Sequence, residues 1–388
     1  MPLSLKTACL QLSPVHGDPR GNMRTADGIL ASLSAEDGID VLLLPEMAFS
    51  GYCFDDVAHV RTVLESDEGA TVEWCKRHAV RLQCTLVCGY PRSVVENDEA
   101  SRGQHPATTS DGASGDESSE KRYNAVVVVG PDGAVIAHYH KSFLYCIDKT
   151  WADEGAGFMW IPIPNAGRGG GGSGNDGGGG EDDGGGGDGG DGGDSGDEGS
   201  GDEDEGGNEV LASLGICMDI NPREFEAPWR AYELANACLK HGSSVLLFSS
   251  AWTNKHPDDD PATVPPVNRN EILTYWLNRL VPLVGSDVHF VCANRVGMEK
   301  GITFTGCSCV MSLKEPRLVA AMGPEDVGVM VQTIEVPTRR ELATQRKTAE
   351  RSGRWGVGHH TGHSENDDES SSSLDEDEEA SEDVSSRS

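Results

Sequence analysis

Three residues of this sequence combine a nucleophile, a proton carrier and a positive charge, and each stands where a predicted buried strand ends and a loop begins. Glu46 ends VLLLPE, Lys141 follows VIAHYH, and Cys217 follows EVLASLGI. In α/β folds, functional side chains commonly lie where a buried strand ends. A thiol can attack a carbonyl carbon, a carboxylate can move protons, and an ammonium can stabilise an oxyanion. Singly, Glu46 could be a surface acid, Lys141 a solvated loop residue and Cys217 a small core side chain, so the combination carries the prediction.

The patterns of apolar residues indicate the elements that hold these three residues. Runs such as VLLL and VLLF are apolar on both sides, as in strands that are buried on both faces. Strands alternate with amphipathic helices and are followed by strand pairs, which predicts a layered α/β sandwich. Strands are expected at residues 6–12, 41–44, 85–89, 124–129, 134–139, 210–216, 244–249, 289–294, 303–311 and 328–334. Helices are expected at residues 21–33, 70–81, 223–241 and 268–284.

The segments around the three residues resemble the Glu, Lys and Cys boxes of the nitrilase superfamily of carbon-nitrogen hydrolases, in the same order. They read LLLPEMAFSGYCF, HKSFLY and GICMDINPREF. The last two segments are most similar to the fungal branch that acts on protein N-termini. In KSFLY, a Phe stands where small-molecule amidases commonly carry a His, and FEAP follows GICMDINP.

This resemblance implies the fold and the domain organisation. The expected fold class is α/β, a four-layer αββα sandwich with a two-fold core. One catalytic domain would occupy residues 1–361, interrupted by disordered insertions at about 95–121 and 167–208. A disordered acidic tail would follow at residues 362–388, because these segments have too little apolar surface to offset their ordering entropy.

The resemblance also assigns roles in amide hydrolysis. Cys217 attacks the carboxamide, ammonia leaves, and water cleaves the resulting thioester. Glu46 carries the protons, because a thiol with a pKa of about 8.5 is only partly ionised at neutral pH. Lys141 and the backbone N–H of Met218 hold the oxyanion, a contribution typically worth about 3–4 kcal/mol. No metal and no other cofactor is required.

Three further residues are candidates for supporting roles, each with a plainer interpretation. Glu154 would orient Lys141 or the water, or be a surface acid. Asp219 would face a substrate α-amino group, or hydrogen-bond its own loop. Trp252, in SSAWTN, would form a wall of the substrate pocket, or pack in the core.

Composition limits the partners and the compartment. The formal net charge is −33, and about two thirds of it lies in residues 166–208 and 363–388. The sequence lacks the Lys and Arg clusters that nucleic acids require, and it has no apolar run of membrane-spanning length. The odd number of cysteines, 11, argues against a disulfide framework and favours a reducing, cytoplasmic location, with mitochondrial import as a minor alternative. The sequence does not predict the oligomeric state.

The predicted function is hydrolysis of the side-chain amide of N-terminal Asn or Gln in polypeptides, which would feed an N-terminal degradation pathway. One alternative keeps the chemistry but uses a small amide, nitrile or N-carbamoyl compound. An open pocket with Asp219 facing the amino group would favour peptides, and a closed pocket with an Arg or Lys for a carboxylate would favour small molecules. The alternative from another class is a catalytically silent scaffold that binds basic partners through its acidic segments.

Overall fold

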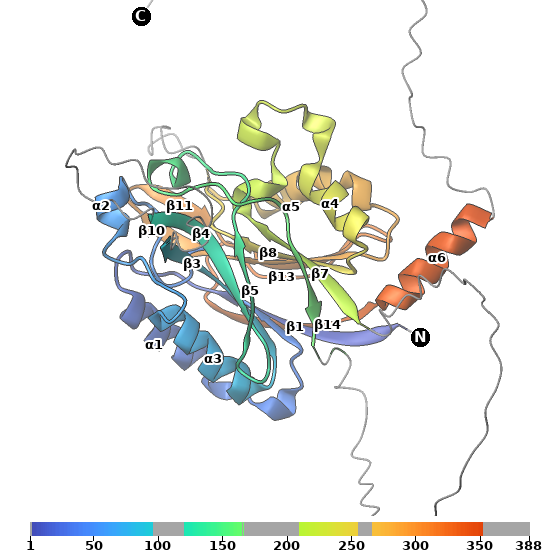
Figure 1. Ribbon diagram of the computed structural model, residues 1–388, viewed down its shortest axis with the longest axis horizontal. Coiled ribbons are helices and arrows are strands. Elements are labelled where there is room, and N and C mark those ends of the chain that lie inside the picture. The colour runs from blue at the N-terminus through green and yellow to red at the C-terminus, as the bar shows by residue number, and fades with distance from the viewer. Residues whose placement is uncertain (1, 96–119, 165, 167–208, 255–265, 352–388) are drawn as a thin grey trace, which may run out of the picture. The chain divides into compact units, whose positions relative to one another are not determined.

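A computed structural model of the chain describes residues 2–95, 120–164, 166, 209–254 and 266–351 (Figure 1). The predicted insertion at 167–208, the tail at 362–388 and the boundary at residue 361 lie outside these ranges. Of the predicted insertion at 95–121, Val95, Glu120 and Lys121 belong to strands. The chain divides into two compact units, residues 1–346 and 347–388, and the first unit contains every described strand.

Two six-stranded sheets form the centre of the first unit. The first sheet has the order β14-β1-β2-β3-β4-β5 and the second has the order β13-β12-β9-β8-β7-β6. The strands of the first are β1 (Leu3–Gln11), β2 (Val41–Leu43), β3 (Thr85–Val95), β4 (Glu120–Val129), β5 (Val135–His140) and β14 (Gly328–Val336). Those of the second are β6 (Trp160–Ile163), β7 (Val210–Ile216), β8 (Val245–Ser250), β9 (His289–Asn294), β12 (Cys309–Ser312) and β13 (Arg317–Ala321). A separate hairpin joins β10 (Val296–Glu299) to β11 (Ile302–Thr305).

Both sheets follow one plan, which confirms the predicted two-fold core. Three parallel strands, β1-β2-β3 in one sheet and β7-β8-β9 in the other, are flanked by antiparallel strands. Because the parallel strands end at the same edge, the loops that follow β2, β5, β7 and β8 can meet there.

The sheets and helices form the four predicted layers. One core lies between the sheets and includes Leu43, Val87 and Leu214. A second core lies beneath α1 (Pro19–Ile29) and α3 (Ala70–Leu82), and a third beneath α4 (Glu233–His241) and α5 (Arg269–Arg279) (Figure 1). Trp74 and Trp276, each fully buried, occupy these two outer cores.

Two predicted elements differ from the structure. The expected helix at 223–241 is helical only from Glu233, because Pro222 and Pro228 precede short 3₁₀ turns and Tyr232 has a positive φ of 46°. The expected strand at 303–311 is split into β11 and β12, because Gly306 and Cys307 have φ values of 56° and 60°. The sequence analysis missed three short strands and two helices: β6, β10, β13, α2 (Val57–Val60) and α6 (Arg339–Arg351).

None of the eleven cysteines, all of which lie in the described ranges, forms a disulfide. Over the same ranges, no helix has both the length and the apolar character needed to cross a membrane.

Candidate active site

The fold brings the three predicted residues to one end of the sandwich. Glu46 follows β2, Lys141 follows β5 and Cys217 follows β7. The Glu46 carboxylate joins the two sheets, because its Oε2 accepts the backbone N–H of Ala251, beyond β8, at 2.8 Å. Gly89 on the neighbouring strand makes room for this turn, since a Cβ there would lie 2.6 Å from the Glu46 Cα.

A buried network of charges surrounds Lys141. Its Nζ donates to Glu46 Oε1 at 2.6 Å and also to Asp148 Oδ2. Asn124 Nδ2 bridges the same two carboxylates, at 2.7 Å from Glu46 Oε1 and 2.9 Å from Asp148 Oδ1. All four side chains are 0% exposed. The network therefore fixes the positions of one cation and two anions without solvent.

Two carboxylates share one cation in this network, and the arrangement acts on the pKa values of Glu46 and Lys141. Burial raises the pKa of Glu46, Lys141 lowers it, and the charge of Asp148 raises it again. Burial lowers the pKa of Lys141, but Asp148 and Glu46 outweigh that effect and hold it above its usual value. Lys141 is therefore a permanent cation at neutral pH.

Cys217 begins a 3₁₀ turn, Cys217–Ile220, with an unusual positive φ of 42°. Residues held in sparsely populated backbone regions cluster at functional sites. Burial and then the charge of Glu46 raise the pKa of the Cys217 thiol, whereas Lys141 lowers it. The resting side chain is thus a thiol, which needs a base to become a nucleophile.

A pocket of about 520 Å³ opens over Cys217. Trp252 forms part of its wall, packing against Tyr275 and Trp276 with ring centroids 5.4 and 5.6 Å apart. Met218 also lines the pocket, directly after the thiol. Among the described residues that line the pocket, Glu271, on the first turn of α5, is acidic.

Two predicted supporting residues take other positions. Glu154 does not orient Lys141: its carboxylate pairs with Arg223 at 2.6 Å near the surface, and Asp148 has the place expected for it. Asp219 does not face a substrate, because it is 0% exposed and already accepts four hydrogen bonds. Its donors are the Tyr139 hydroxyl and the N–H groups of Ser142, Phe143 and Ile216, at 2.7–3.0 Å.

The sequence analysis missed three residues of this centre: Asp148, Asn124 and Tyr52. Asp148 had a weak signal, because it is an acid that directly follows the largely apolar run FLYCI. The Tyr52 ring lies 5.7 Å from Lys141 Nζ, and its buried hydroxyl has no hydrogen-bond partner among the described residues.

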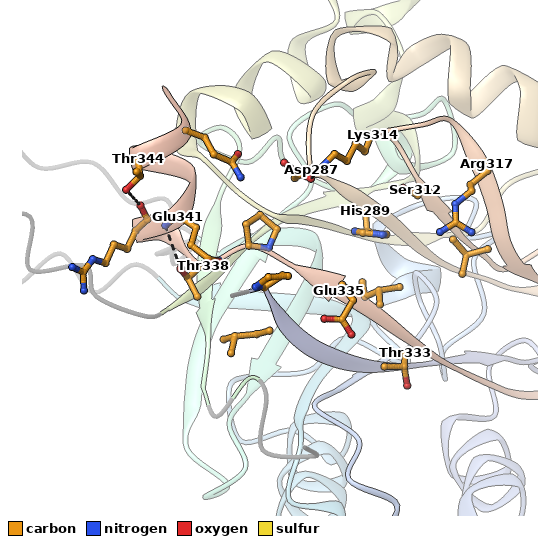
Figure 2. A pocket seen from close by; sticks show the side chains of 17 residues that line it. Asp287, His289, Ser312, Lys314, Arg317, Thr333, Glu335, Thr338, Glu341 and Thr344 are labelled. Atoms are coloured by element: carbon orange, nitrogen blue, oxygen red, sulfur yellow. Dashed lines mark hydrogen bonds and ion pairs between the residues drawn. The ribbon is translucent and has the colours of Figure 1, made fainter. Parts of the chain in front are cut away.

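A larger cavity, of about 1180 Å³, lies away from these residues (Figure 2). Side chains such as His289 at the start of β9 and Thr333 on β14 line it. This cavity therefore lies at the edge of the sheets opposite to the edge that carries Cys217. Its charges are mixed, and Lys314 pairs with Asp287 at 2.7 Å. None of Glu46, Lys141 and Cys217 lines this cavity.

The model of one family matches residues 6–226, more than half of the chain, and its description is carbon-nitrogen hydrolase. The chain belongs to this family and is a hydrolase of carbon-nitrogen bonds other than peptide bonds. This confirms the resemblance inferred from the three sequence boxes.

Relatives within the family include proteins named protein N-terminal amidase. The one from Schizosaccharomyces pombe is 25% identical over 351 residues, covering 85% of this chain and 100% of that protein. The one from Saccharomyces cerevisiae is 26% identical over 303 residues, covering 74% of this chain and 54% of that protein, so this chain spans about half its length. A crystal structure of N-terminal amidase with an Asn-Glu peptide has a TM-score of 0.62 at 18% identity, covering 86% of this chain and 98% of the other. That likeness confirms the fold.

Proposed function

We propose that this chain hydrolyses the side-chain amide of an N-terminal Asn or Gln in polypeptides, releasing ammonia. The observation that carries the proposal is the charge of the pocket over Cys217. Among the described residues that line it, Glu271 is acidic and none is Lys or Arg. A free N-terminus carries a positive α-amino group that an acid can bind, whereas N-carbamoyl and related small amides carry a carboxylate that needs a cation.

The relatives support the same substrate class. The two curated relatives bear the name protein N-terminal amidase. Solved structures of N-terminal amidase include complexes with an Asn-Glu peptide and with a Gln-Val peptide. An N-terminal Asp or Glu product would feed an N-terminal degradation pathway. The absence of disulfides among the described cysteines supports a cytoplasmic location, and we assign residues 1–361 to one catalytic domain.

The proposed reaction has two halves. Glu46 takes the proton of the Cys217 thiol, the sulfur attacks the amide carbon, and the carbon-nitrogen bond breaks as Glu46 returns the proton to the departing ammonia. Water then loses a proton to Glu46 and attacks the thioester, and Cys217 recovers its proton as the carbon-sulfur bond breaks. In both halves Lys141 and the N–H of Met218 stabilise the oxyanion. Asp148 and Asn124 act as positioning residues for Lys141 and Glu46.

Mass spectrometry of matched peptides tests the proposed function. The peptides begin with Asn, Gln or N-acetyl-Asn, or carry Asn only internally. We expect a gain of about 1 Da, the mass of amide-to-acid conversion, only where the terminal amino group is free. Ammonia release from N-carbamoyl amino acids, with no peptide converted, would instead assign the chain to the small-molecule alternative.

Glu271→Gln should weaken the binding of peptide substrates while leaving the chemical step intact. Because Glu271 is exposed, removing its charge should raise KM by about fivefold to tenfold with little change in kcat. Steady-state kinetics on the Asn peptide measures both constants. Glu315→Gln, an exposed acid outside the pocket lining, is the matched control. An unchanged KM in Glu271→Gln would mean that Glu271 does not bind the α-amino group of the substrate.

The acidic side of the pH profile should report Glu46. A base must be ionised to accept the thiol proton, and the pKa of Glu46 is raised above 4.5. Activity should therefore fall as the pH drops, at a pH higher than an ordinary Glu would give. Asp148→Asn removes a charge that raises this pKa, so the acidic limb of kcat/KM should move to lower pH. If the acidic limb of the pH profile does not move in Asp148→Asn, the limb reports the ionisation of a group other than Glu46.

A further inference from the structure

A second cluster of ionisable side chains lies beneath the loop that follows Glu46. Glu299, at the end of β10, is 5% exposed and bonds to Arg295. Its Oε2 also accepts the backbone N–H groups of Tyr52 at 2.8 Å and Cys53 at 3.1 Å. Burial alone would raise the pKa of Glu299, but Arg295 and the hydrogen bonds lower it to about 2. Glu299 is therefore a fixed anion.

Two histidines extend this cluster towards solvent, and we call them the imidazole pair. His16 Nδ1 lies 3.2 Å from Glu299 Oε2, and His59 Nδ1 lies 3.2 Å from Asp55 Oδ2. The two Nε2 atoms face each other at 3.2 Å. The side chains of His16 and His59 are 22% and 32% exposed, so a small solute can reach them.

The surrounding backbone holds the imidazole pair in place. Gly51, with a φ of +84°, makes room for His16, because a Cβ there would lie 2.5 Å from Nδ1. The Phe54 ring packs against both imidazoles, with centroids 4.7 Å from His16 and 5.2 Å from His59. The Asp56 side chain accepts the backbone N–H of His59 at 2.7 Å.

The hydrogen bonds to the two carboxylates decide what can lie between the Nε2 atoms. If each Nδ1–H donates to its carboxylate, both neutral Nε2 atoms carry lone pairs, which repel each other at 3.2 Å. A cation between them removes that repulsion. Two nitrogens bound to one tetrahedral zinc ion lie about 3.3–3.4 Å apart, given Zn–N bonds of about 2.0–2.1 Å. Metal-bound histidines characteristically donate their other ring N–H to a carboxylate, and here each Nδ1 lies 3.2 Å from a carboxylate oxygen.

We propose that His16 and His59 form a binding site for a divalent transition metal ion of the zinc class, separate from the catalytic centre. The described residues contain no group of three or more side chains suited to hold a metal, so water would complete the coordination. Imidazole nitrogens suit Zn²⁺, Cu²⁺ and Ni²⁺ and disfavour Mg²⁺ and Ca²⁺. With two protein ligands, we expect a dissociation constant for Zn²⁺ of about 1–100 µM near neutral pH.

A different tautomer is the competing arrangement. The backbone N–H of Asp55 lies 3.4 Å from His59 Nδ1, and if Nδ1 accepts it, His59 Nε2–H donates to His16. That arrangement is an ordinary hydrogen bond and needs no metal. The two arrangements predict opposite results on adding metal.

Calorimetric titration of the full chain with Zn²⁺ distinguishes them. A Cys217→Ala background removes the catalytic thiol as a ligand. Three further histidines, His359, His360 and His363, lie close together in the sequence segment GHHTGH, and their substitution by Ser removes them as ligands. We expect His16→Gln and His59→Gln each to lose one bound Zn²⁺, and Asp55→Asn to keep it with about tenfold weaker affinity. His241→Gln, a partly exposed histidine stacked on Trp160, is the matched control and should titrate like its parent.

A second measurement covers the case in which a histidine variant folds poorly. Saturating Zn²⁺ should raise the Tm of the parent and of His241→Gln, and leave the Tm of His59→Gln unchanged. Added Mg²⁺ should shift none of them. Equal Zn²⁺ stoichiometry in the parent and in both imidazole variants, or an equal Tm shift, would overturn the metal site and favour the imidazole–imidazole hydrogen bond.

Discussion

Cys217→Ala should abolish amide hydrolysis, with a loss in kcat of about 10⁴-fold or more. The covalent route needs a sulfur at this position, and the charges of Glu46 and Lys141 already act on its pKa. Ammonia release and peptide mass, followed under single-turnover conditions, measure the loss. The wild type should in addition accumulate a thioester adduct on Cys217 when the reaction is quenched in acid.

Cys238→Ala is the matched control for this prediction. Cys238 is 0% exposed, but it lies on α4 and packs into the outer core, outside the pocket lining. Its loss should lower stability and leave kcat within about twofold. Equal activity in the Cys217→Ala variant and the wild type would refute the covalent mechanism.

Lys141→Met should reduce both activity and stability strongly. The substitution leaves Glu46 and Asp148 buried without their cation, which should cost about 3–5 kcal/mol in the free energy of unfolding. Loss of the oxyanion contact should lower kcat by a further factor of about 10²–10³. Urea unfolding and steady-state kinetics measure the two effects separately.

Two further variants separate these effects. Lys149→Met removes an exposed lysine that pairs with Glu224 at 2.8 Å, and should change stability by less than about 1 kcal/mol. Adding Asp148→Asn to Lys141→Met removes one of the two buried negative charges that have lost their cation. The double variant should therefore be more stable than Lys141→Met, but it should remain as inactive. Full stability in Lys141→Met would show that the buried carboxylates are neutral in the folded chain.

Much of the fold was readable from local patterns. The runs VLLL and VLLF are apolar on both sides, and both are strands covered on two faces, one by the other sheet and one by helices. Predictions failed where a few backbone angles interrupt a pattern. The helix expected from residue 223 begins at Glu233, after Tyr232 with its positive φ, and no apolar periodicity records such an angle.

The active site likewise combines residues that the sequence predicted with residues that only the structure identified. The sequence placed Glu46, Lys141 and Cys217 at strand ends, and β2, β5 and β7 carry the three residues to one edge of the sandwich. It named Glu154 as the acid beside Lys141 and missed Asp148, although both follow Lys141 in the same loop. A 3₁₀ turn at Asp148–Thr150 accompanies the inward position of Asp148, whereas Glu154 pairs with Arg223 at the surface.

The sequence alone indicated the chemistry that we propose: a thiol, a carboxylate and an ammonium, each after a strand, in boxes that resemble those of the carbon-nitrogen hydrolases. Only the tertiary structure decided which further groups act on that chemistry. It showed that Asp219 is buried and accepts four hydrogen bonds, that Glu271 lines the pocket, and that the imidazoles of His16 and His59 face each other. The physical reason is distance along the chain. Burial and secondary structure follow from neighbouring residues, whereas Glu46 and Lys141 are 95 residues apart and meet only after both sheets have packed.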